Sequence, residues 1–463
     1  MCMLRNMGIQ LVELIKKNTS AQFRLTLSSQ LDGLSRRLVS KEAGVDNKVS
    51  ILIKKSIIAA ENHEYDTAET LLLQAARLCP ENSQISPHLS LVRYLRFRSL
   101  DVNARESKNE MLKTIDQMNR ELKIKEIYVP GSFWSTVGIY HLDLLERYGI
   151  ENFKRTVSHH YQNWLMVSSD DEQVVQLHKL WAIHQSIKPW FTTIEVPDNV
   201  GYSYTQDFSD PVYPLSINKN REIYRVSVGM LWEYVKSIDK YQFLEKISES
   251  EIGNPIRIKS DGQMISSDIA HSVRERNLLL DSLSLSGEEE LIVGELGAGH
   301  GRLAEVFGKT TNYKHFIFDI TPALYVSQWY IKKMFPDEKI FQFRPFDNFE
   351  DIRQEIEGCR YAFFTSNQIE KIPAEYFDLF INLNSLAEMA PVQINNFITQ
   401  IHRVTSTAFL SRQQLDNFNP IEKVRLVKSS YKMPDGWTLR LDNIDEIHPI
   451  YFNQIWEKFE KST

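Results

Sequence analysis

Cysteine, glycine and proline are scarce in this sequence, and long apolar runs are missing. Its three cysteines, Cys2, Cys79 and Cys359, form no CxxC pair, so they predict neither a disulfide framework nor a zinc site and suit a reducing compartment. Only 18 glycines and 16 prolines occur among 463 residues, which excludes collagen-like and low-complexity chains. No apolar run reaches the roughly 18 residues of a membrane-spanning helix.

Neither sign of charge dominates. Lys and Arg number 54 and Asp and Glu number 60, which leaves a net charge of −6. Nucleic-acid binding normally requires a basic face, so we predict no nucleic-acid partner. Arg5 and Glu13 interrupt the apolar N-terminal stretch, which therefore lacks the core of a signal peptide. At about 150 residues per domain, the length predicts about three domains, and we expect them to be cytoplasmic.

Residues 1–125 are predicted to be helical. Within 51–82, small residues stand where two helices would cross, at Ala68 and Ala75, and Leu72 faces the same side. This pattern resembles a single tetratricopeptide unit, with a generic helical hairpin as the equal alternative. Such hairpins offer a face to partners, so we expect this region to contact another protein or a second copy of the chain.

Residues 126–287 are expected to form a mainly helical cap or substrate region. The pattern predicts an amphipathic segment at 133–165 with Gly149 as a helix stop, a long loop at 198–220, and a further helix at 226–247. Four aromatic residues of this region are expected in its core rather than as sugar-stacking platforms: Tyr161, Trp164, Trp232 and Tyr234.

Residues 288–463 alternate short β-rich runs with helices. The predicted strands are 291–296, 315–320, 341–346, 361–366, 377–383 and 437–441. The predicted helices are 302–309, 323–335, 391–404 and 450–459. Apolar strands interleaved with amphipathic helices predict an α/β fold, a mostly parallel sheet covered on both faces.

One motif stands at the end of the first of these strands. In ELGAGHGR, Gly297, Gly299 and Gly301 alternate with Ala298 and His300. Glycine permits a tight turn and leaves room for a ligand near the backbone amides. The spacing differs from the dinucleotide fingerprint, since an arginine stands at its third glycine position. The strand–loop–helix setting favours cofactor binding over a structural turn.

Acidic and polar residues accompany this loop. Glu295 is predicted to point at the mouth of the site, where an acid suits a cationic ligand and would repel a pyrophosphate. Asp319 ends the second strand, where a carboxylate can accept hydrogen bonds from both hydroxyls of a ribose. Further polar groups follow the later strands and are expected in the same crevice: Ser366, Asn367 and Gln368 at an adenine edge, and Asn382, Asn384, Ser385 and Glu388.

The glycine loop, Glu295 and Asp319 together resemble the class I S-adenosylmethionine-dependent methyltransferases. This resemblance implies a Rossmann-like domain with S-adenosyl-L-methionine as its cofactor. The order FW…YGIENFKRTVSHHYQNW, GNPIRIKSDGQMISSDIAHSVRERN, ELGAGHGR and LFINLNSLAEM is, over residues 127–463, similar to the bacterial sugar O-methyltransferase family. That family implies methyl transfer to a hydroxyl of a sugar or glycan acceptor in surface-polysaccharide synthesis. No metal-binding carboxylate set is evident, so we predict no metal.

A sugar hydroxyl is a poor nucleophile, so a positioned base should accelerate the transfer by ~10²–10⁴-fold. The candidates, in order, are Glu388, Asp268 and the histidines His271 and His300. A helix-terminal acid is the structural alternative for Glu388. Two other functions compete with the leading one: a non-catalytic interaction protein with a vestigial methyltransferase fold, and a methyltransferase whose acceptor is a protein or small metabolite.

Overall fold

The structure is a computed structural model, and it falls into two compact units. They comprise residues 1–99 with 208–212, and residues 100–207 with 213–463. The described residues are 47–60, 62, 64–79, 85, 88–89, 92, 110–160, 171–183, 193–195, 221–419 and 424–459. The predicted loop 198–220 and the side chains of Tyr161 and Trp164 lie outside them. Within these ranges, no helix combines the length and the apolar character needed to cross a bilayer.

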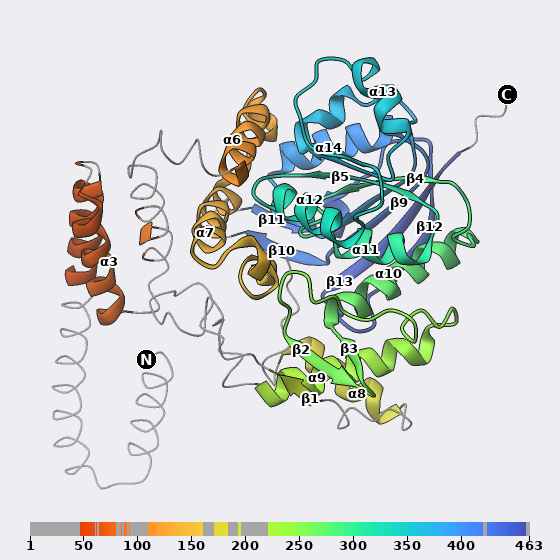
Figure 1. Ribbon diagram of the computed structural model, residues 1–463, viewed down its shortest axis with the longest axis horizontal. Helices are drawn as coiled ribbons and strands as arrows, with labels where there is room; N and C mark the ends of the chain where they lie inside the picture. The colour runs from red at the N-terminus through yellow and green to blue at the C-terminus, as the bar shows by residue number, and fades with distance from the viewer. Residues whose placement is uncertain are drawn as a thin grey trace, which may run out of the picture. The chain divides into compact units, whose positions relative to one another are not determined.

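The first unit contains a helical hairpin, as predicted. Residues 47–60 form one helix, and α3 (Tyr65–Leu78) follows it (Figure 1). Ala68, Leu72 and Ala75 are fully buried in the shared core. The small side chains of Ala68 and Ala75 let the two helices approach closely, with Leu72 packed between them. The likeness to a tetratricopeptide unit stays a prediction.

A large sheet organises the second unit. Its order is β12-β13-β9-β8-β4-β5-β7-β6. The strands are β4 (Ile292–Leu296), β5 (Lys314–Asp319), β6 (Ile340–Phe341), β7 (Tyr361–Thr365), β8 (Phe377–Leu383), β9 (Thr405–Gln414), β12 (Trp437–Ile444) and β13 (Tyr451–Lys458). The strand β13 runs antiparallel to both β9 and β12, and all the other neighbouring pairs in this sheet are parallel. The predicted α/β fold class with a mostly parallel sheet is confirmed.

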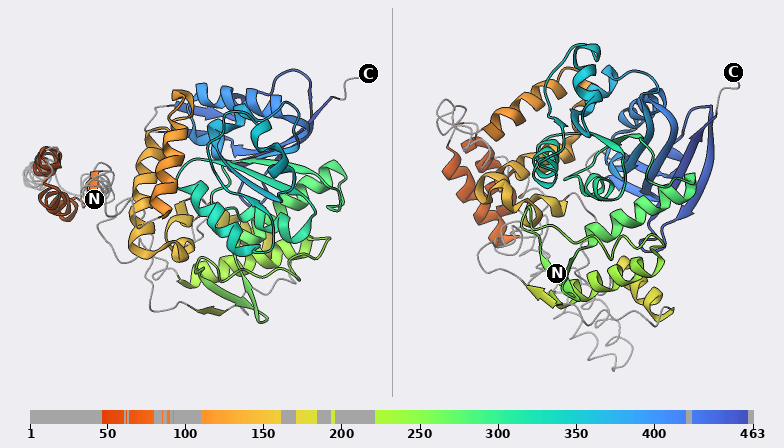
Figure 2. Two further views of the ribbon diagram at one scale, coloured as in Figure 1. Left: turned by 45° about the horizontal axis from the view of Figure 1, so that its top comes forward. Right: turned by 45° about the vertical axis from the view of Figure 1, so that its right-hand side comes forward.

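Helices cover both faces of this sheet (Figures 1 and 2). On one face lie α10 (Ser267–Leu283), α11 (Arg302–Thr310) and α12 (Ala323–Met334), and on the other α13 (Glu350–Glu357) and α14 (Pro391–Val404). Side chains alternate along a strand, so Ile317 packs with α12 while Phe316 and Phe318 pack with α13 and α14. Apolar residues on both faces of β5 explain its continuous hydrophobic run.

A second, smaller core lies on the outer side of α10. It contains α8 (Glu172–Ile183), α9 (Arg221–Ile238) and a three-stranded sheet of β1 (Thr193–Glu195), β2 (Arg257–Ser260) and β3 (Gln263–Ile265). Trp232 and Tyr234 are buried there, as expected. The helix α7 (Ser132–Tyr148) ends at Gly149, whose φ of 79° fits the predicted stop. The small sheet was not predicted.

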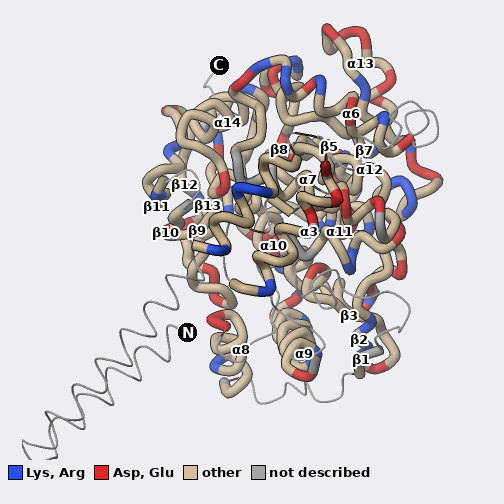
Figure 3. Tube along the Cα trace, turned by 90° about the vertical axis from the view of Figure 1, so that its left-hand side faces the viewer, with Lys and Arg blue, Asp and Glu red and all other residues tan. Residues whose placement is uncertain are grey.

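Shorter elements complete the second unit. They are η1 (Glu126–Tyr128), η2 (Ile150–Arg155), η3 (Val157–His160), η5 (Ser366–Lys371), η6 (Ser385–Glu388), η7 (Lys428–Ser430), β10 (Asp416–Asn419) and β11 (Val424–Val427). Figure 3 shows acidic and basic positions interspersed along the traces of α8, α9 and α13, in keeping with the small net charge.

The unit boundary falls earlier than the expected division at residue 125. The helix α6 (Glu110–Leu122) clusters with the large sheet, not with the hairpin. Its Glu121 is buried and pairs with Lys371 of η5 at 2.9 Å, and it is bonded to Asn367 as well. Only one stripe of this helix is buried, and its other residues are exposed or half-buried, which explains why its sequence is polar.

Three strands of the large sheet depart from the sequence expectations. The predicted final helix 450–459 is wrong, because the segment is the strand β13 between β9 and β12. Tyr451 to Ile455 are all buried, since the strand is central and both of its faces are covered. A run buried on both sides shows no period of two, so it resembles a helix segment. The strand β9 was not predicted, and β6 is shorter than predicted.

Candidate active site

A cavity of about 890 Å³, including its open mouth, lies at the carboxyl ends of β4, β5 and β8. In open α/β sheets this edge is where ligands bind. The described residues that line it are Tyr128, Pro130, Gly131, Trp134, Leu296, Gly297, Gly299, Asp319, Ile320, Ala323, Ser366, Leu383, Asn384, Ser385, Glu388, Met389, Gln393 and Phe397. They include two carboxylates and neither lysine nor arginine, so the cavity suits a ligand with positive charge.

The glycine loop forms the floor of the cavity. Gly297, Gly299 and Gly301 have φ values of 76°, 61° and 89°, which only glycine adopts readily. A Cβ on Gly297 would lie 2.3 Å from the Ser385 hydroxyl oxygen. Gly301 precedes the first residue of α11 and ends the turn. The loop therefore depends on its glycines for both backbone conformation and space. The small residue between them, Ala298, is buried in the core with α12 and does not line the cavity.

Asp319 stands beside this loop at the end of β5. Its two carboxylate oxygens accept the backbone N–H groups of Gly299 at 3.0 Å and Ile320 at 2.7 Å. Burial raises the pKa of Asp319 to about 7, against the opposing effect of these hydrogen bonds. Each oxygen keeps further acceptor capacity, so the carboxylate can still bind hydroxyl donors.

Two polar atoms in the cavity wall have no partner within the described chain. They are the hydroxyl of Ser366, at the start of η5, and the amide oxygen of Asn384, just after β8. Both residues are more than nine-tenths buried. Buried polar groups in folded proteins are nearly always hydrogen-bonded, so these two atoms point to a polar ligand.

Asn367 and Gln368 do not line the cavity, contrary to expectation. The Asn367 amide donates to the Glu121 backbone oxygen at 3.0 Å. The Gln368 side chain accepts from Thr365 N at 3.0 Å and donates to Arg344 O at 3.0 Å. The helix η5 begins at Ser366, so the chain turns there and carries the next two side chains away. Of the predicted adenine edge, only Ser366 borders the cavity.

Glu295 also differs from expectation. It is buried, and its carboxylate is bonded to His315 Nε2 of β5 at 2.7 Å. Because side chains alternate along β4, Leu296 takes the position that lines the cavity. Asn382, also expected in the crevice, does not line the cavity either, and its amide donates to the Leu296 carbonyl at 2.9 Å.

Glu388 is the highest-ranked base candidate, and it borders the cavity. It ends η6, and its Oε2 accepts the indole N–H of Trp134 of α7 at 2.8 Å. Burial raises the pKa of Glu388 to about 8, the Trp134 hydrogen bond opposes this, and the negative charge of Asp319 adds to it. Two carboxylates with raised pKa values in one cavity are typical of a functional site.

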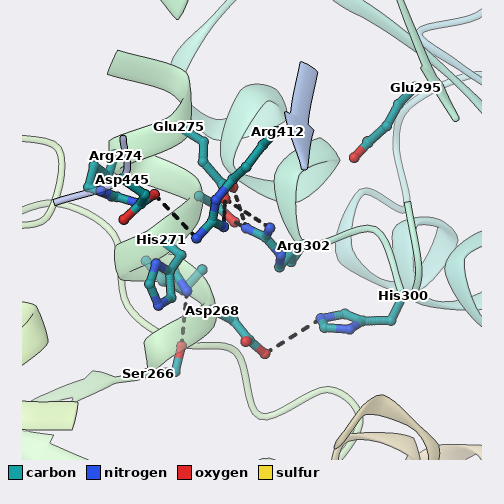
Figure 4. Close-up of polar contacts among 12 residues, drawn as sticks. Ser266, Asp268, His271, Arg274, Glu275, Glu295, His300, Arg302, Arg412 and Asp445 are labelled. Carbon is teal, nitrogen blue, oxygen red and sulfur yellow. Dashed lines mark hydrogen bonds and ion pairs between the residues drawn. The ribbon is translucent and has the colours of Figure 1, made fainter. Parts of the chain in front are cut away.

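The other base candidates lie outside the lining of this cavity. Asp268, at the start of α10, has an oxygen 3.8 Å from His300 Nε2, and Figure 4 shows the two side chains turned toward each other. His300 is buried, with its ring against Phe153. His271 is fully buried 3.2 Å from the Gln173 amide, and burial with nearby arginines lowers its pKa well below the usual value. These positions fit packing better than proton transfer.

A buried ion-pair network under the sheet was missed by sequence reasoning. Arg302 pairs with Glu275 at 2.6 Å, and Arg412 pairs with the same carboxylate at 3.0 Å (Figure 4). Arg412 and Arg274 both pair with Asp445. Arg302, which stands at the third glycine position of the dinucleotide fingerprint, thus links α11 to α10. Its partners come from distant segments, so no local signal reveals it.

The wall opposite the sheet was also missed. Tyr128, Pro130, Gly131 and Trp134 line the cavity from the segment before and within α7. Gln393 of α14 fastens this segment by donating to the backbone oxygens of residues 127 and 129 at 3.1 and 3.0 Å. Among the described residues, no cluster of three or more His, Cys, Asp or Glu side chains could hold a metal ion.

No protein-family model and no curated protein matches this chain. Solved structures match part of it. An S-adenosylmethionine-dependent methyltransferase from Aquifex aeolicus is 10% identical, covering 40% of this chain and 89% of that one, at a TM-score of 0.26. The magnesium protoporphyrin IX methyltransferase of Synechocystis PCC 6803, with bound S-adenosylhomocysteine, is 12% identical, covering 43% and 90%, at 0.30. The 1,6-didemethyltoxoflavin N1-methyltransferase of Burkholderia thailandensis, also with S-adenosylhomocysteine, is 12% identical, covering 42% and 79%, at 0.27. Scores this low carry no conclusion about activity.

Proposed function

We propose that this chain is an S-adenosylmethionine-dependent O-methyltransferase whose acceptor is a hydroxyl of a sugar or glycan. The observation that carries the proposal is the cradle at the end of β4 and β5, where the left-handed glycine loop meets the buried carboxylate of Asp319. The sugar acceptor rests on the resemblance of four sequence segments to the bacterial sugar O-methyltransferase family.

The residues of the cavity fit this cofactor. Asp319 would accept the ribose hydroxyls, while the unsatisfied Ser366 hydroxyl and Asn384 amide oxygen would bind polar edges of the ligand. Asp319 and Glu388 supply negative charge near a sulfonium as they ionise around pH 7 and pH 8, and no described lining residue is a lysine or an arginine. The glycine loop leaves its backbone amides accessible.

The cofactor supplies an electrophilic methyl group. Glu388 would take the proton of the acceptor hydroxyl at a carboxylate oxygen. A pKa of about 8 makes this oxygen more basic than that of an ordinary glutamate, and it is available as a base mainly above pH 8. The cavity walls would align the acceptor oxygen with the methyl carbon. The entropy cost of bringing the two reactants together in this orientation is then met by binding rather than in the chemical step. Met389 and Phe397 line the same cavity and would exclude water from this region.

Calorimetry of the full chain with S-adenosylhomocysteine tests the proposal first. Binding is expected, and replacing Gly299 by valine should abolish it because a β-branched residue does not adopt a φ of 61°. A product mass gain of one methyl group, measured over a panel of nucleotide sugars, glycans, peptides and small alcohols, then identifies the acceptor class. Binding without transfer to any acceptor would favour a vestigial binding module, and no binding would refute the enzyme.

A further inference from the structure

The base candidate is held from the opposite wall of the cavity. Glu388 belongs to η6, whereas Trp134 belongs to α7, 254 residues earlier in the chain. The indole N–H is a donor only and cannot receive a proton. Any part that Trp134 plays in proton transfer is therefore exerted through the carboxylate that it contacts.

The backbone around Glu388 is fixed by other residues. Ala387 N donates to the Gln413 side-chain oxygen at 3.1 Å, and its carbonyl accepts the Asn417 amide at 2.6 Å. Loss of the Trp134 hydrogen bond would consequently leave η6 in place and release only the Glu388 side chain. The two parts of the site, fixed backbone and tethered carboxylate, can be perturbed separately.

We propose that Trp134 is the positioning residue of this site: its indole N–H orients the Glu388 carboxylate toward the acceptor hydroxyl and favours the ionised form that can take the proton. The inference rests on the proposed function, in which Glu388 is the base. It adds that α7, from the helical region before the sheet domain, supplies a necessary part of the proton-transfer apparatus.

The groups around Glu388 leave the Trp134 hydrogen bond as the interaction that favours its ionised form. From β5, Asp319 faces Glu388 and disfavours its ionisation. Tyr431, just after η7, has a hydroxyl with no hydrogen-bond partner in the described part of the chain. Burial raises the pKa of this hydroxyl, and the charge of Glu388 adds to the rise. No lysine or arginine lines the cavity among the described residues, so the Trp134 N–H is the group that opposes burial and repulsion.

The test compares two tryptophan-to-phenylalanine variants. Trp134→Phe keeps an aromatic ring and removes the N–H. Trp437→Phe is the matched control, because its indole N–H also donates at 2.8 Å, to His402 Nδ1 of α14, and it does not line the cavity. Turnover is measured from pH 6 to pH 10. Melting temperature is measured over the same range for both variants, each with and without Glu388→Gln.

The expected result is an alkaline displacement in Trp134→Phe alone. A hydrogen bond to a charged group is worth enough to move the titration by about one pH unit or more. With a wild-type midpoint of about 8, turnover at pH 7 should fall about tenfold and recover above pH 9. The pH at which the stabilising effect of Glu388→Gln on the melting temperature levels off, set by the folded-state pKa, should move upward by the same amount. Trp437→Phe should show neither displacement.

An unchanged midpoint of turnover, together with an unchanged pH at which the Glu388→Gln effect on the melting temperature levels off, would overturn the inference. If Trp134→Phe does not fold, 3-benzothienylalanine at the same position keeps the shape of the indole without its N–H and gives the same comparison. Failure of the proposed function is recognised separately, as absence of S-adenosylhomocysteine binding by the wild-type chain. The melting experiment needs no cofactor, so it decides the Trp134–Glu388 coupling in either case.

Discussion

Replacing Glu388 by glutamine separates a catalytic base from a structural acid. Glutamine keeps the size and one acceptor oxygen for Trp134 but cannot take a proton, so turnover should fall by ~10²-fold or more. Affinity for S-adenosylhomocysteine, which has no acceptor proton to lose, should stay nearly unchanged. A helix-terminal role predicts the reverse, a loss of ~0.3–1 kcal/mol of stability with normal turnover per folded molecule.

The stability of the same variant has a sign that depends on pH. The pKa of Glu388 rises from 4.5 in the unfolded chain to about 8 in the folded one, so its contribution to stability is fully present below pH 4.5 and is lost as pH rises through 8. At ~1.4 kcal/mol per pH unit, the full shift gives an upper limit of about 5 kcal/mol. Because the side chain is only partly buried, about 2 kcal/mol is the working value. Glu388→Gln should thus stabilise the protein at pH 9 and leave it unchanged at pH 4.5.

Glu289→Gln is the matched control. Glu289 also accepts a hydrogen bond from an aromatic residue, Tyr313, but at the amino-terminal side of β4. Backbone hydrogen bonds from residues 286 and 287 lower the pKa of Glu289 to about 2, so this variant should lose stability at neutral pH and keep its turnover. Melting curves and turnover are measured on one preparation of each protein. Normal turnover in Glu388→Gln, or a lower melting temperature at pH 9, would refute the reasoning.

Three other predictions follow from the cavity and the unit boundary. Asp319→Ala should weaken S-adenosylhomocysteine binding by about 1.5–3 kcal/mol in calorimetry. The control Asp378→Ala removes an acid that accepts a hydrogen bond from Ile292 N and should leave the affinity unchanged. Equal affinities of Asp319→Ala and the wild type would exclude Asp319 from the site. The affinity of S-adenosylmethionine relative to S-adenosylhomocysteine should rise by about tenfold from pH 6 to pH 9, because the sulfonium charge favours ionised Asp319 and Glu388; a flat ratio would place the sulfonium elsewhere. A chain beginning at residue 100 should bind S-adenosylhomocysteine like the full protein, and one beginning at 127 should bind it less well or aggregate, since it lacks α6 and its Glu121–Lys371 pair; full affinity of the shorter chain would show that α6 is dispensable.

The sequence alone predicted those features that depend on residues close together in the chain. The glycine loop followed from the sequence because alternating glycines after an apolar strand permit few other conformations, and all three have positive φ. Asp319 followed because the carboxyl ends of parallel strands meet at one edge. Gly149 as the end of α7, and Trp232 as a core residue, likewise depend on neighbours close in the chain or on helical period.

Where the cause is a contact between distant segments, only the tertiary structure decided the outcome. The strand β13 is buried on both faces because β9 and β12 flank it, and that burial erased the alternation that marks a strand. Glu295 turned away from the cavity because His315 on the neighbouring strand holds it, and Asn367 turned to α6 for the same kind of reason. The site depends on contacts between distant segments, above all the hydrogen bond between Trp134 and Glu388. These two residues are 254 positions apart, and no periodicity or motif predicts a contact at that distance in the sequence.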